Sequence, residues 1–327
     1  MEYVRLGSTG VRISRACLGC EPFGSSALNP WALDEETSFS IVREAVELGI
    51  NFFDTADVYS LGRSEEVLGK AVKEFMRRDE VLIATKVFFP MGDSPNGRGL
   101  SRKHILSSAD ASLKRLGTDY IDLYQIHRWD ADTPIEETLD ALDYLVRSGR
   151  VRYLGASSMF AWQLAKALFT ADRLGKARFV SMSSQYNLIF RWDEREMIPL
   201  CRDQGLAVLP WGSLARGFLA GNRSAQDRGG ATLRSKTDKI AQKWFYSPSD
   251  FTVVDVVKRL AGELRCSAAQ VAIAWVASRI GVTAPVIAAT RIGQLRELVA
   301  ALDIKLPSEG ISMLQAASQP TRWPDHW

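Results

Sequence analysis

Short apolar runs alternate with longer segments of helical period along almost the whole chain, and this alternation constrains the fold more than any other feature. Short apolar runs are typical of buried strands, and a 3.6-residue period is typical of amphipathic helices. Eight runs predict strands, at residues 16–20, 51–54, 81–87, 121–127, 151–157, 179–185, 207–211 and 285–290. The helical segments that follow them span 34–48, 64–76, 101–116, 135–147, 162–174, 195–204, 267–278 and 293–302.

Strands that alternate with helices favour a parallel sheet with right-handed crossover connections. Eight such units are the number found in a closed (β/α)8 barrel, the TIM barrel. The competing architecture is an open doubly wound sheet, but its G-x-G-x-x-G fingerprint does not occur in this sequence. We therefore expect an α/β protein with one barrel domain over residues 1–327.

Two segments are expected to add to the repeating units. A Gly-Ser-Thr-Gly turn between residues 3–6 and 11–14 predicts an N-terminal β-hairpin. Residues 216–249 follow the seventh strand, are rich in Gly, Ser, Arg and Lys, and are predicted to be irregular. Because a long insertion in a compact domain is often functional, we expect this segment to form a lid loop.

Charge and cysteine content exclude several classes of protein. The chain has 41 Lys and Arg against 38 Asp and Glu, and the two signs are interspersed. Nucleic-acid binders usually show a clustered basic face, so no nucleic-acid partner is expected. Four cysteines are too few for a disulfide scaffold. Cys17 and Cys20 lack a second pair nearby, so we interpret them as small apolar strand residues and expect no metal site.

No segment predicts association with a membrane. The first residues, MEYVRLGSTG, lack the apolar region of a signal peptide. The longest nearly uncharged apolar stretch, 268–277, is shorter than the roughly 18–20 residues that a spanning helix requires. We expect a soluble, cytoplasmic protein whose oligomeric state stays open, a homo-oligomer included. The aromatic tail, 321–327, is suited either to pack on a partner or to reach a pocket.

Four polar residues stand at or just beyond the ends of predicted strands. Asp54 ends the second strand and Tyr59 follows it, while Lys86 and His127 end the third and fourth. Each has a structural explanation when taken alone: a loop cap, an interface aromatic, a simple ion pair and a core histidine. In a parallel barrel, however, the carboxyl ends of the strands form one mouth, where active sites lie. The four together therefore predict a catalytic site.

This combination of side chains suits carbonyl reduction. Hydride addition leaves a negative oxygen that must be protonated, and a tyrosine with an ordinary pKa of about 10 is a reluctant acid at neutral pH. A nearby ammonium, Lys86, favours the phenolate, and Asp54 is suited to keep that lysine charged and in place. His127 is suited to donate a hydrogen bond to the carbonyl oxygen. This chemistry requires no metal.

The motifs around these residues resemble those of the aldo-keto reductase superfamily. GINFFDTADVY, ATK, QIH, YLGASS and SQYNL occur in the matching order and strand context, and IAATR lies near the end of the chain. HRWD at 127–130 and TLRSKTD at 232–238 resemble a bacterial and fungal subgroup with a long lid after the seventh strand. The resemblance implies a (β/α)8 barrel and an NADPH-preferring reductase that uses the four residues above, with Tyr59 as the general acid.

The resemblance also implies contacts to NADPH or NADP+. The implied residues are Ser157, Ser158, Gln185 and Trp211 for the nicotinamide, Ser213, Leu214 and Gly217 for the diphosphate, and Thr290, Arg291 and Gln294 for the adenosine 2′-phosphate. Arg234 and Lys236 of the lid are expected either to close over the diphosphate or to belong to a solvated basic loop. Arginine presents a fork suited to phosphate, and a helix start favours an anion, which supports the assignment of Arg291. The chain departs from the family at Ser158, where asparagine is usual.

Substrate preference is expected to come from the lid and four further residues, Glu21, Phe23, Phe88 and Trp129. Glu21 is unusual, because a carboxylate near the pocket accepts hydrogen bonds from the hydroxyl groups of polyol or sugar-like substrates. The expected partner is therefore a small carbonyl or alcohol.

Two other functions stay open on the sequence alone. One is a cofactor-binding regulatory subunit with slow turnover, which potassium-channel beta subunits resemble. The other is a barrel isomerase or lyase in which Lys86 forms a Schiff base. In that case Tyr59 matters less than Lys86, and no nicotinamide binds.

Overall fold

The computed structural model describes residues 1–230 and 232–318, so the tail at 321–327 lies outside the described residues. Eight parallel strands form one sheet in the order β10-β3-β4-β5-β6-β7-β8-β9. The strands are β3 (Cys17–Gly19), β4 (Phe52–Asp54), β5 (Leu82–Val87), β6 (Ile121–Ile126), β7 (Val151–Ser157), β8 (Phe179–Ser183), β9 (Ala207–Val208) and β10 (Val286–Ile287). Each lies within one of the eight predicted runs.

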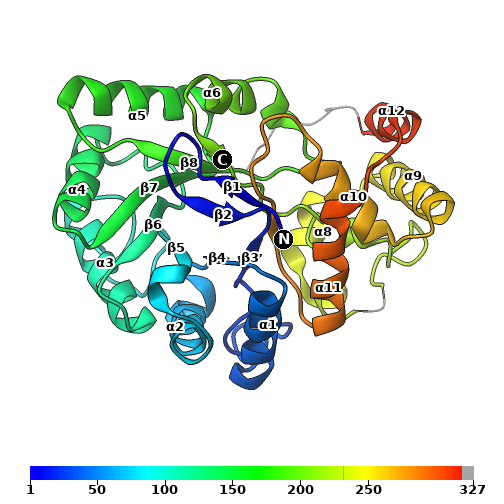
Figure 1. Ribbon diagram of the computed structural model, residues 1–327, viewed down its shortest axis with the longest axis horizontal. Helices are drawn as coiled ribbons and strands as arrows, with labels where there is room; N and C mark the ends of the chain where they lie inside the picture. Colours follow the sequence, from blue (N-terminus) through cyan, green and yellow to red (C-terminus); the bar gives the residue numbers. More distant parts are fainter. Residues whose placement is uncertain (231, 319–327) are drawn as a thin grey trace.

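The two ends of this sheet meet. β10 pairs with β3 at one edge, and Val208 of β9 forms a bridge to Val282, just before β10. The backbone N–H of Val286 also donates to the carbonyl of Pro210 at 2.7 Å. Figure 1 shows the sheet curled within a ring of helices. The predicted (β/α)8 barrel is confirmed.

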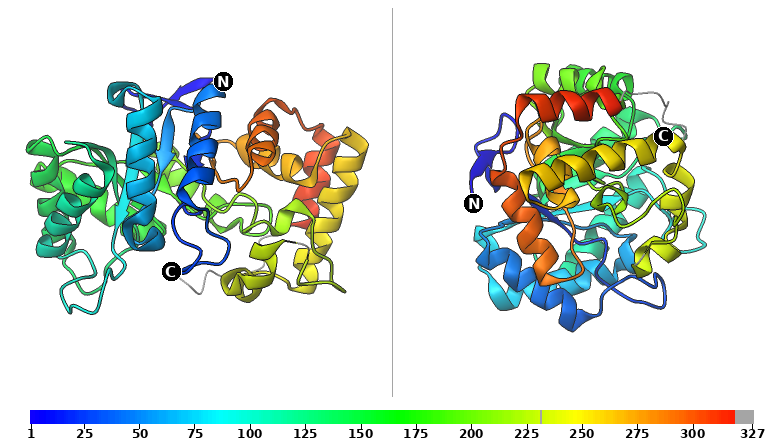
Figure 2. Two further views of the ribbon diagram at one scale, coloured as in Figure 1. Left: turned by 90° about the horizontal axis from the view of Figure 1, so that it is seen from below. Right: turned by 90° about the vertical axis from the view of Figure 1, so that its right-hand side faces the viewer.

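The N-terminal hairpin is also confirmed, as β1 (Tyr3–Arg5) paired antiparallel with β2 (Arg12–Ser14). Leu6 and Ile13 of the hairpin are fully buried, in a cluster with Phe52 and Leu123 from the barrel strands. Figure 2 shows the hairpin at the opposite end of the barrel from the long connecting loops. The hairpin therefore closes the end of the barrel that does not carry the predicted site.

Helices cover the outside of the sheet (Figure 1). Those that match the predicted segments are α1 (Glu35–Glu47), α2 (Arg63–Phe75), α3 (Arg102–Leu116), α4 (Ile135–Arg147), α5 (Ala161–Leu174), α6 (Met197–Asp203), α10 (Ala268–Ala277) and α11 (Ile292–Ala300). Their apolar faces are buried; in α4 the buried face includes Ile135, Leu139 and Leu142, spaced as one stripe of a helix. α1 begins after Asp34, whose carboxylate accepts from the backbone N–H of Thr37 at 2.8 Å.

Four helices were not predicted. α9 (Pro248–Leu264) and α12 (Ser308–Ala317) lie side by side, and α7 (Leu233–Thr237) and α8 (Lys239–Trp244) lie inside the lid segment that the sequence predicts to be irregular. The sequence does carry a signal for α9, because Ser247 and Asp250 form a capping box with Pro248 at the first helical position. The lid is thus partly helical.

The two N-terminal cysteines are structural. Cys17 and Cys20 are fully buried and carry free thiols, as expected for small apolar residues of a strand.

No cluster of three or more metal-ligating side chains occurs in residues 1–230 and 232–318. Within the same residues, no helix combines the length and apolarity that crossing a bilayer requires.

Candidate active site

An ion pair between Lys86 and Asp54 lies at the carboxyl end of neighbouring strands β5 and β4. Lys86 Nζ lies 2.6 Å from Asp54 Oδ2, 2.8 Å from the carbonyl oxygen of Thr55 and 3.3 Å from the hydroxyl of Tyr59. Burial works to lower the pKa of Lys86, but the Asp54 carboxylate and the Tyr59 oxygen together outweigh it and raise the pKa above its usual value. Lys86 is therefore a buried ammonium with all three protons directed at oxygen atoms.

Tyr59 opens a short 3₁₀ turn, η1 (Tyr59–Gly62), which residues 55–58 separate from the end of β4. The next two residues, Ser60 and Leu61, have left-handed backbone conformations with φ of 48° and 52°. Such strain in non-glycine residues is common at functional sites. Burial raises the pKa of Tyr59 to about 12, although the Lys86 ammonium opposes the rise. The phenol is thus protonated at neutral pH, with a cation beside its oxygen.

His127 directly follows β6, and its ring meets that of Tyr59 edge to face, with ring centroids 5.9 Å apart. Burial and the positive charges of Lys86 and Arg128 lower the pKa of His127 well below its usual value. Nδ1 is buried and has no hydrogen-bond partner among the described residues. The imidazole is therefore neutral, with one ring nitrogen that donates and one that accepts.

Sequence reasoning missed three residues of this site. The side-chain amide of Gln125 donates to Asp54 Oδ1 at 2.9 Å, so both oxygens of Asp54 are engaged. Gln125 lies two positions before His127, and alternate residues of a strand share a face, which is the signal that was available. Phe89 and Arg128 line the cavity beside Tyr59 and His127.

A cavity of about 970 Å³ extends from this group to the start of α11. Among the residues implied to bind the cofactor, those lining it are Ser157, Ser158, Trp211, Ser213, Leu214, Gly217, Arg234, Thr290, Arg291 and Gln294. Gln185 is not one of the lining residues; its backbone forms a bridge to Trp211. Trp211 donates from its indole N–H to Ser158 Oγ at 3.1 Å, which fixes the ring at the cavity wall.

The far end of the cavity lies where β10 leads into α11. The side-chain oxygen of Gln294 accepts from both the backbone N–H and the hydroxyl of Thr290, each at 3.0 Å. Arg291 is exposed and is the N-cap residue of α11. A helix start presents free backbone N–H groups, so this end favours an anion.

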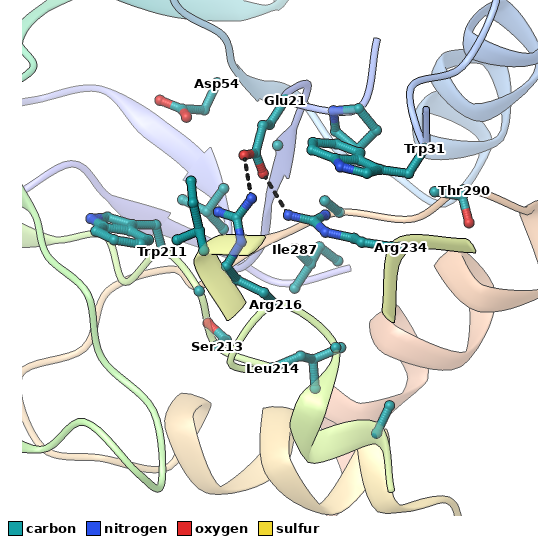
Figure 3. Close-up of a pocket in the computed structure, with 18 of the residues that line it drawn as sticks. Glu21, Trp31, Asp54, Trp211, Ser213, Leu214, Arg216, Arg234, Ile287 and Thr290 are labelled. Carbon is teal, nitrogen blue, oxygen red and sulfur yellow. Dashed lines mark hydrogen bonds and ion pairs between the residues drawn. The ribbon is translucent and has the colours of Figure 1, made fainter. Parts of the chain in front are cut away.

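Glu21 joins the lid to the loop after β3. Its carboxylate lies 3.3 Å from Arg216 and 3.0 Å from Arg234 (Figure 3). Both arginines also contact Asp238. Burial alone raises the pKa of Glu21, but the two guanidinium groups lower it to about 2. Arg234 also lies over the ring of Trp31, 4.1 Å from its centroid. The Glu21 carboxylate is thus engaged by the lid instead of being free to accept hydrogen bonds from a polyol.

The other residues expected to contact substrate do not line the cavity. Phe23 is fully buried in the core. Phe88 packs against the core and does not line the cavity, whereas the next residue, Phe89, does; their rings meet edge to face, with centroids 5.3 Å apart. Trp129 lies against Trp162, with ring centroids 6.1 Å apart. Phe89, which sequence reasoning did not name, lines the cavity beside His127.

The dinucleotide that the resemblance implies fits these residues. The cavity is at the upper end of the usual range for ligand sites and joins the Tyr59 group to an anion-favouring helix start. Gly217, on its wall, has φ of +85°, and a Cβ there meets no atom within 4 Å. The backbone at Gly217 is thus open to a closely approaching ligand.

Comparison with known proteins agrees with this geometry. A model of the Aldo/keto reductase family matches residues 17–319. Versiconal hemiacetal acetate reductase of Aspergillus parasiticus is 42% identical, with 98% of each chain covered. A putative aryl-alcohol dehydrogenase of Saccharomyces cerevisiae is 36% identical, again with 98% of each chain covered. An uncharacterized oxidoreductase of Bacillus subtilis is 39% identical, covering 96% of this chain and 95% of its own.

Proposed function

The chain belongs to the aldo/keto reductase family, and from that premise we propose that it transfers a hydride between NADPH and the carbonyl carbon of an aldehyde, ketone or sugar-like substrate. Family membership and relatives named as reductases and dehydrogenases make it an oxidoreductase. The observation that carries the finer proposal is the position of Lys86 Nζ between the Asp54 carboxylate and the Tyr59 hydroxyl, at 2.6 and 3.3 Å.

Tyr59 is the general acid of the proposed reaction. Its hydroxyl faces the cavity and is protonated at neutral pH, since its pKa is raised to about 12 by burial. When it gives up its proton, the phenolate lies beside the Lys86 ammonium, which offsets part of the cost of a buried anion. Asp54 keeps Lys86 charged, and Gln125 fixes Asp54. Gln125 thus acts on Asp54, Asp54 on Lys86, and Lys86 on Tyr59.

His127 orients and polarises the substrate carbonyl. Because its pKa is well below the usual value, the ring is neutral and offers an N–H without adding a charge. Its edge-to-face contact with Tyr59 puts both groups at one end of the cavity. A carbonyl oxygen bound there accepts hydrogen bonds from the two residues together.

The nicotinamide supplies the hydride when the dinucleotide is bound. Trp211, Ser157 and Ser158 line the cavity at the Tyr59 end and are suited to its ring and carboxamide. Thr290, Arg291 and Gln294 line the other end, where a guanidinium and a helix start favour a 2′-phosphate and hence NADPH over NADH.

The geometry argues against a lyase that uses Lys86 as a Schiff base. Nucleophilic attack requires a neutral amine, but the pKa of Lys86 is raised above its usual value by Asp54. Its three hydrogen bonds to oxygen occupy all of the ammonium protons. The lysine is therefore suited to an electrostatic role.

The proposed partner is a small carbonyl or alcohol substrate, with no nucleic-acid or membrane partner. Relatives named versiconal hemiacetal acetate reductase and aryl-alcohol dehydrogenase favour an aromatic or hemiacetal-forming substrate. Phe89 supports this preference, because its ring lines the cavity near His127, with ring centroids 4.9 Å apart.

The test is steady-state oxidation of NADPH and of NADH over aromatic aldehydes, short aldehydes, sugars and diketones. We expect turnover that favours NADPH and falls at least about 100-fold in Tyr59→Phe, since general acid catalysis contributes about 10²–10⁴. Tyr59→Phe should still bind NADP+. Tight cofactor binding without turnover on any substrate would favour the regulatory subunit, and no binding of either cofactor would contradict the proposed function.

A further inference from the structure

Charges in the lid and the loop after β3 do not balance. Glu21 and Asp238 pair with Arg216 and Arg234, and we call these four residues the lid cluster. Each of the two arginines contacts both carboxylates, so the pairing within the cluster is complete. A third arginine, Arg223, lies close enough for Asp238 and Arg234 to affect its pKa. Three guanidinium groups and two carboxylates leave one positive charge without a counter-charge.

Arg223 is the cation that remains. It is only 3% exposed, and neither Nε nor Nη1 has a hydrogen-bond partner among the described residues. No ion pair of Arg223 occurs within residues 1–230 and 232–318. Burial lowers its pKa, as expected for a cation removed from water. Burying a charge without a partner costs free energy, and a bound anion would compensate the charge of Arg223.

Arg223 lies on the wall of the cavity that is proposed to hold the dinucleotide. Arg223 and its neighbour Asn222, whose side-chain oxygen also lacks a partner, line the cavity that contains Tyr59. They follow the turn η4 (Phe218–Ala220), which begins directly after Gly217. The guanidinium lies near the ring of Tyr246, 5.5 Å from its centroid, and Tyr246 has a left-handed backbone with φ of 81°. Strain of this kind in a non-glycine residue is typical of a functional site.

We propose that Arg223 binds the diphosphate of the dinucleotide, and this inference rests on the proposed function. The planar guanidinium presents paired N–H donors that match phosphate oxygens. The sequence offered Arg234 as one candidate for the diphosphate, but Arg234 is already engaged by Glu21, Asp238 and the ring of Trp31. The 2′-phosphate has its own candidate in Arg291, on a different element. Arg223 thus supplies the positive charge that pairs with the diphosphate, because the arginines of the lid cluster are already paired with carboxylates.

The experiment measures binding, not turnover. Dissociation constants for NADP+ and NAD+ are determined by titration calorimetry on the full chain, for wild type, Arg223→Gln and Arg223→Lys. The matched control is Arg228→Gln, which removes an exposed arginine of the same lid that does not line the cavity. We expect Arg223→Gln to raise both constants by about 10- to 100-fold with their ratio unchanged, since a hydrogen bond to a charged group is lost. The dissociation constants of Arg223→Lys should lie between those of wild type and Arg223→Gln, and those of Arg228→Gln should equal those of wild type.

Unliganded melting temperatures give a second readout. Because Arg223→Gln removes an uncompensated buried charge, its melting temperature without ligand should equal or exceed that of wild type. Inorganic pyrophosphate should raise the melting temperature of wild type but not of Arg223→Gln, by linkage. A lower unliganded melting temperature in Arg223→Gln would overturn the inference, because it would mean that Arg223 stabilises the lid itself.

The remaining outcomes separate this inference from the proposed function. If wild type binds the dinucleotides and Arg223→Gln binds them equally well, the inference is wrong and the proposed function stands. A loss confined to NADP+ would also overturn it, by assigning Arg223 to the 2′-phosphate. If wild type responds to pyrophosphate in an Arg223-dependent way but binds neither dinucleotide, the anion site stands and the proposed function fails.

Discussion

The side-chain amide of Gln125 donates to Asp54 Oδ1 at 2.9 Å while Lys86 occupies Oδ2 at 2.6 Å, so Asp54 is held from both sides in a buried position. The carboxylate therefore does not contact the cavity through a free oxygen. Its effect on any reaction at Tyr59 passes through the charge and position of Lys86.

Asp54→Asn should lower kcat by about 100-fold and change its pH dependence. Without the carboxylate, burial dominates and the pKa of Lys86 falls, so the ammonium beside Tyr59 is lost as pH rises. The alkaline limb of kcat should then shift to lower pH than in wild type. The measurement is kcat between pH 6 and 10 with NADP+ affinity as the control, and a profile parallel to that of wild type would contradict the proposed role.

Glu21→Gln should destabilise the protein at neutral pH and about half as much at pH 3. The pKa of Glu21 is about 2 in the folded protein, below its unfolded value near 4.3, so its ion pairs contribute stability above the unfolded value that is lost as pH falls toward 2. We expect a loss of about 1–2 kcal/mol at pH 7, reduced from the full linkage value because the side chain is one third exposed. Urea unfolding at both pH values measures this. Glu263→Gln, in an exposed pair with Arg259, is the control and should have no effect at either pH.

Arg291→Ala should raise the dissociation constant of NADP+ by about 10- to 100-fold and leave that of NAD+ unchanged. The reason is that the exposed guanidinium at the start of α11 serves only the 2′-phosphate in the proposed complex. Competition titrations with the two dinucleotides measure the ratio. Equal losses for both would show that Arg291 does not distinguish them.

Asp193→Asn should stabilise the protein at pH 8 and not at pH 4. Asp193 Oδ2 is buried without a partner among the described residues, and burial raises the pKa of this carboxyl to about 7. Between about pH 4 and 7 the folded state binds more protons at this site than the unfolded state, so stability falls as pH rises. The gain at pH 8 should be about 2–4 kcal/mol. Asp255→Asn, at an exposed position of α9, provides the control, and an equal gain at both pH values would refute the assignment.

Much of the fold was accessible from the sequence because it depends on local pattern. The eight apolar runs predicted the eight strands, and the ends of three of them identified Asp54, Lys86 and His127 as neighbours in space. Parallel pairing brings equivalent strand ends to one edge, so strand order and alternation were sufficient. α9 was missed although its capping box at Ser247 was readable, because the lid was interpreted as a single irregular insertion.

The sequence by itself determined the alternation of strands and helices, the closed barrel and the residues gathered at its mouth, because each follows from periodicity along the chain. Only the tertiary structure decided which charged side chains of the lid pair with one another and which stays unpaired. Glu21 meets Arg216 and Arg234, which lie 195 and 213 positions further along the chain. Pairing over such separations depends on where loops return in space, and the same packing left Arg223 buried without a counter-charge. Tertiary packing likewise placed Phe89 on the cavity wall and Phe88 against the core, because β5 ends at Val87 and the residues beyond it do not continue the alternation of a strand.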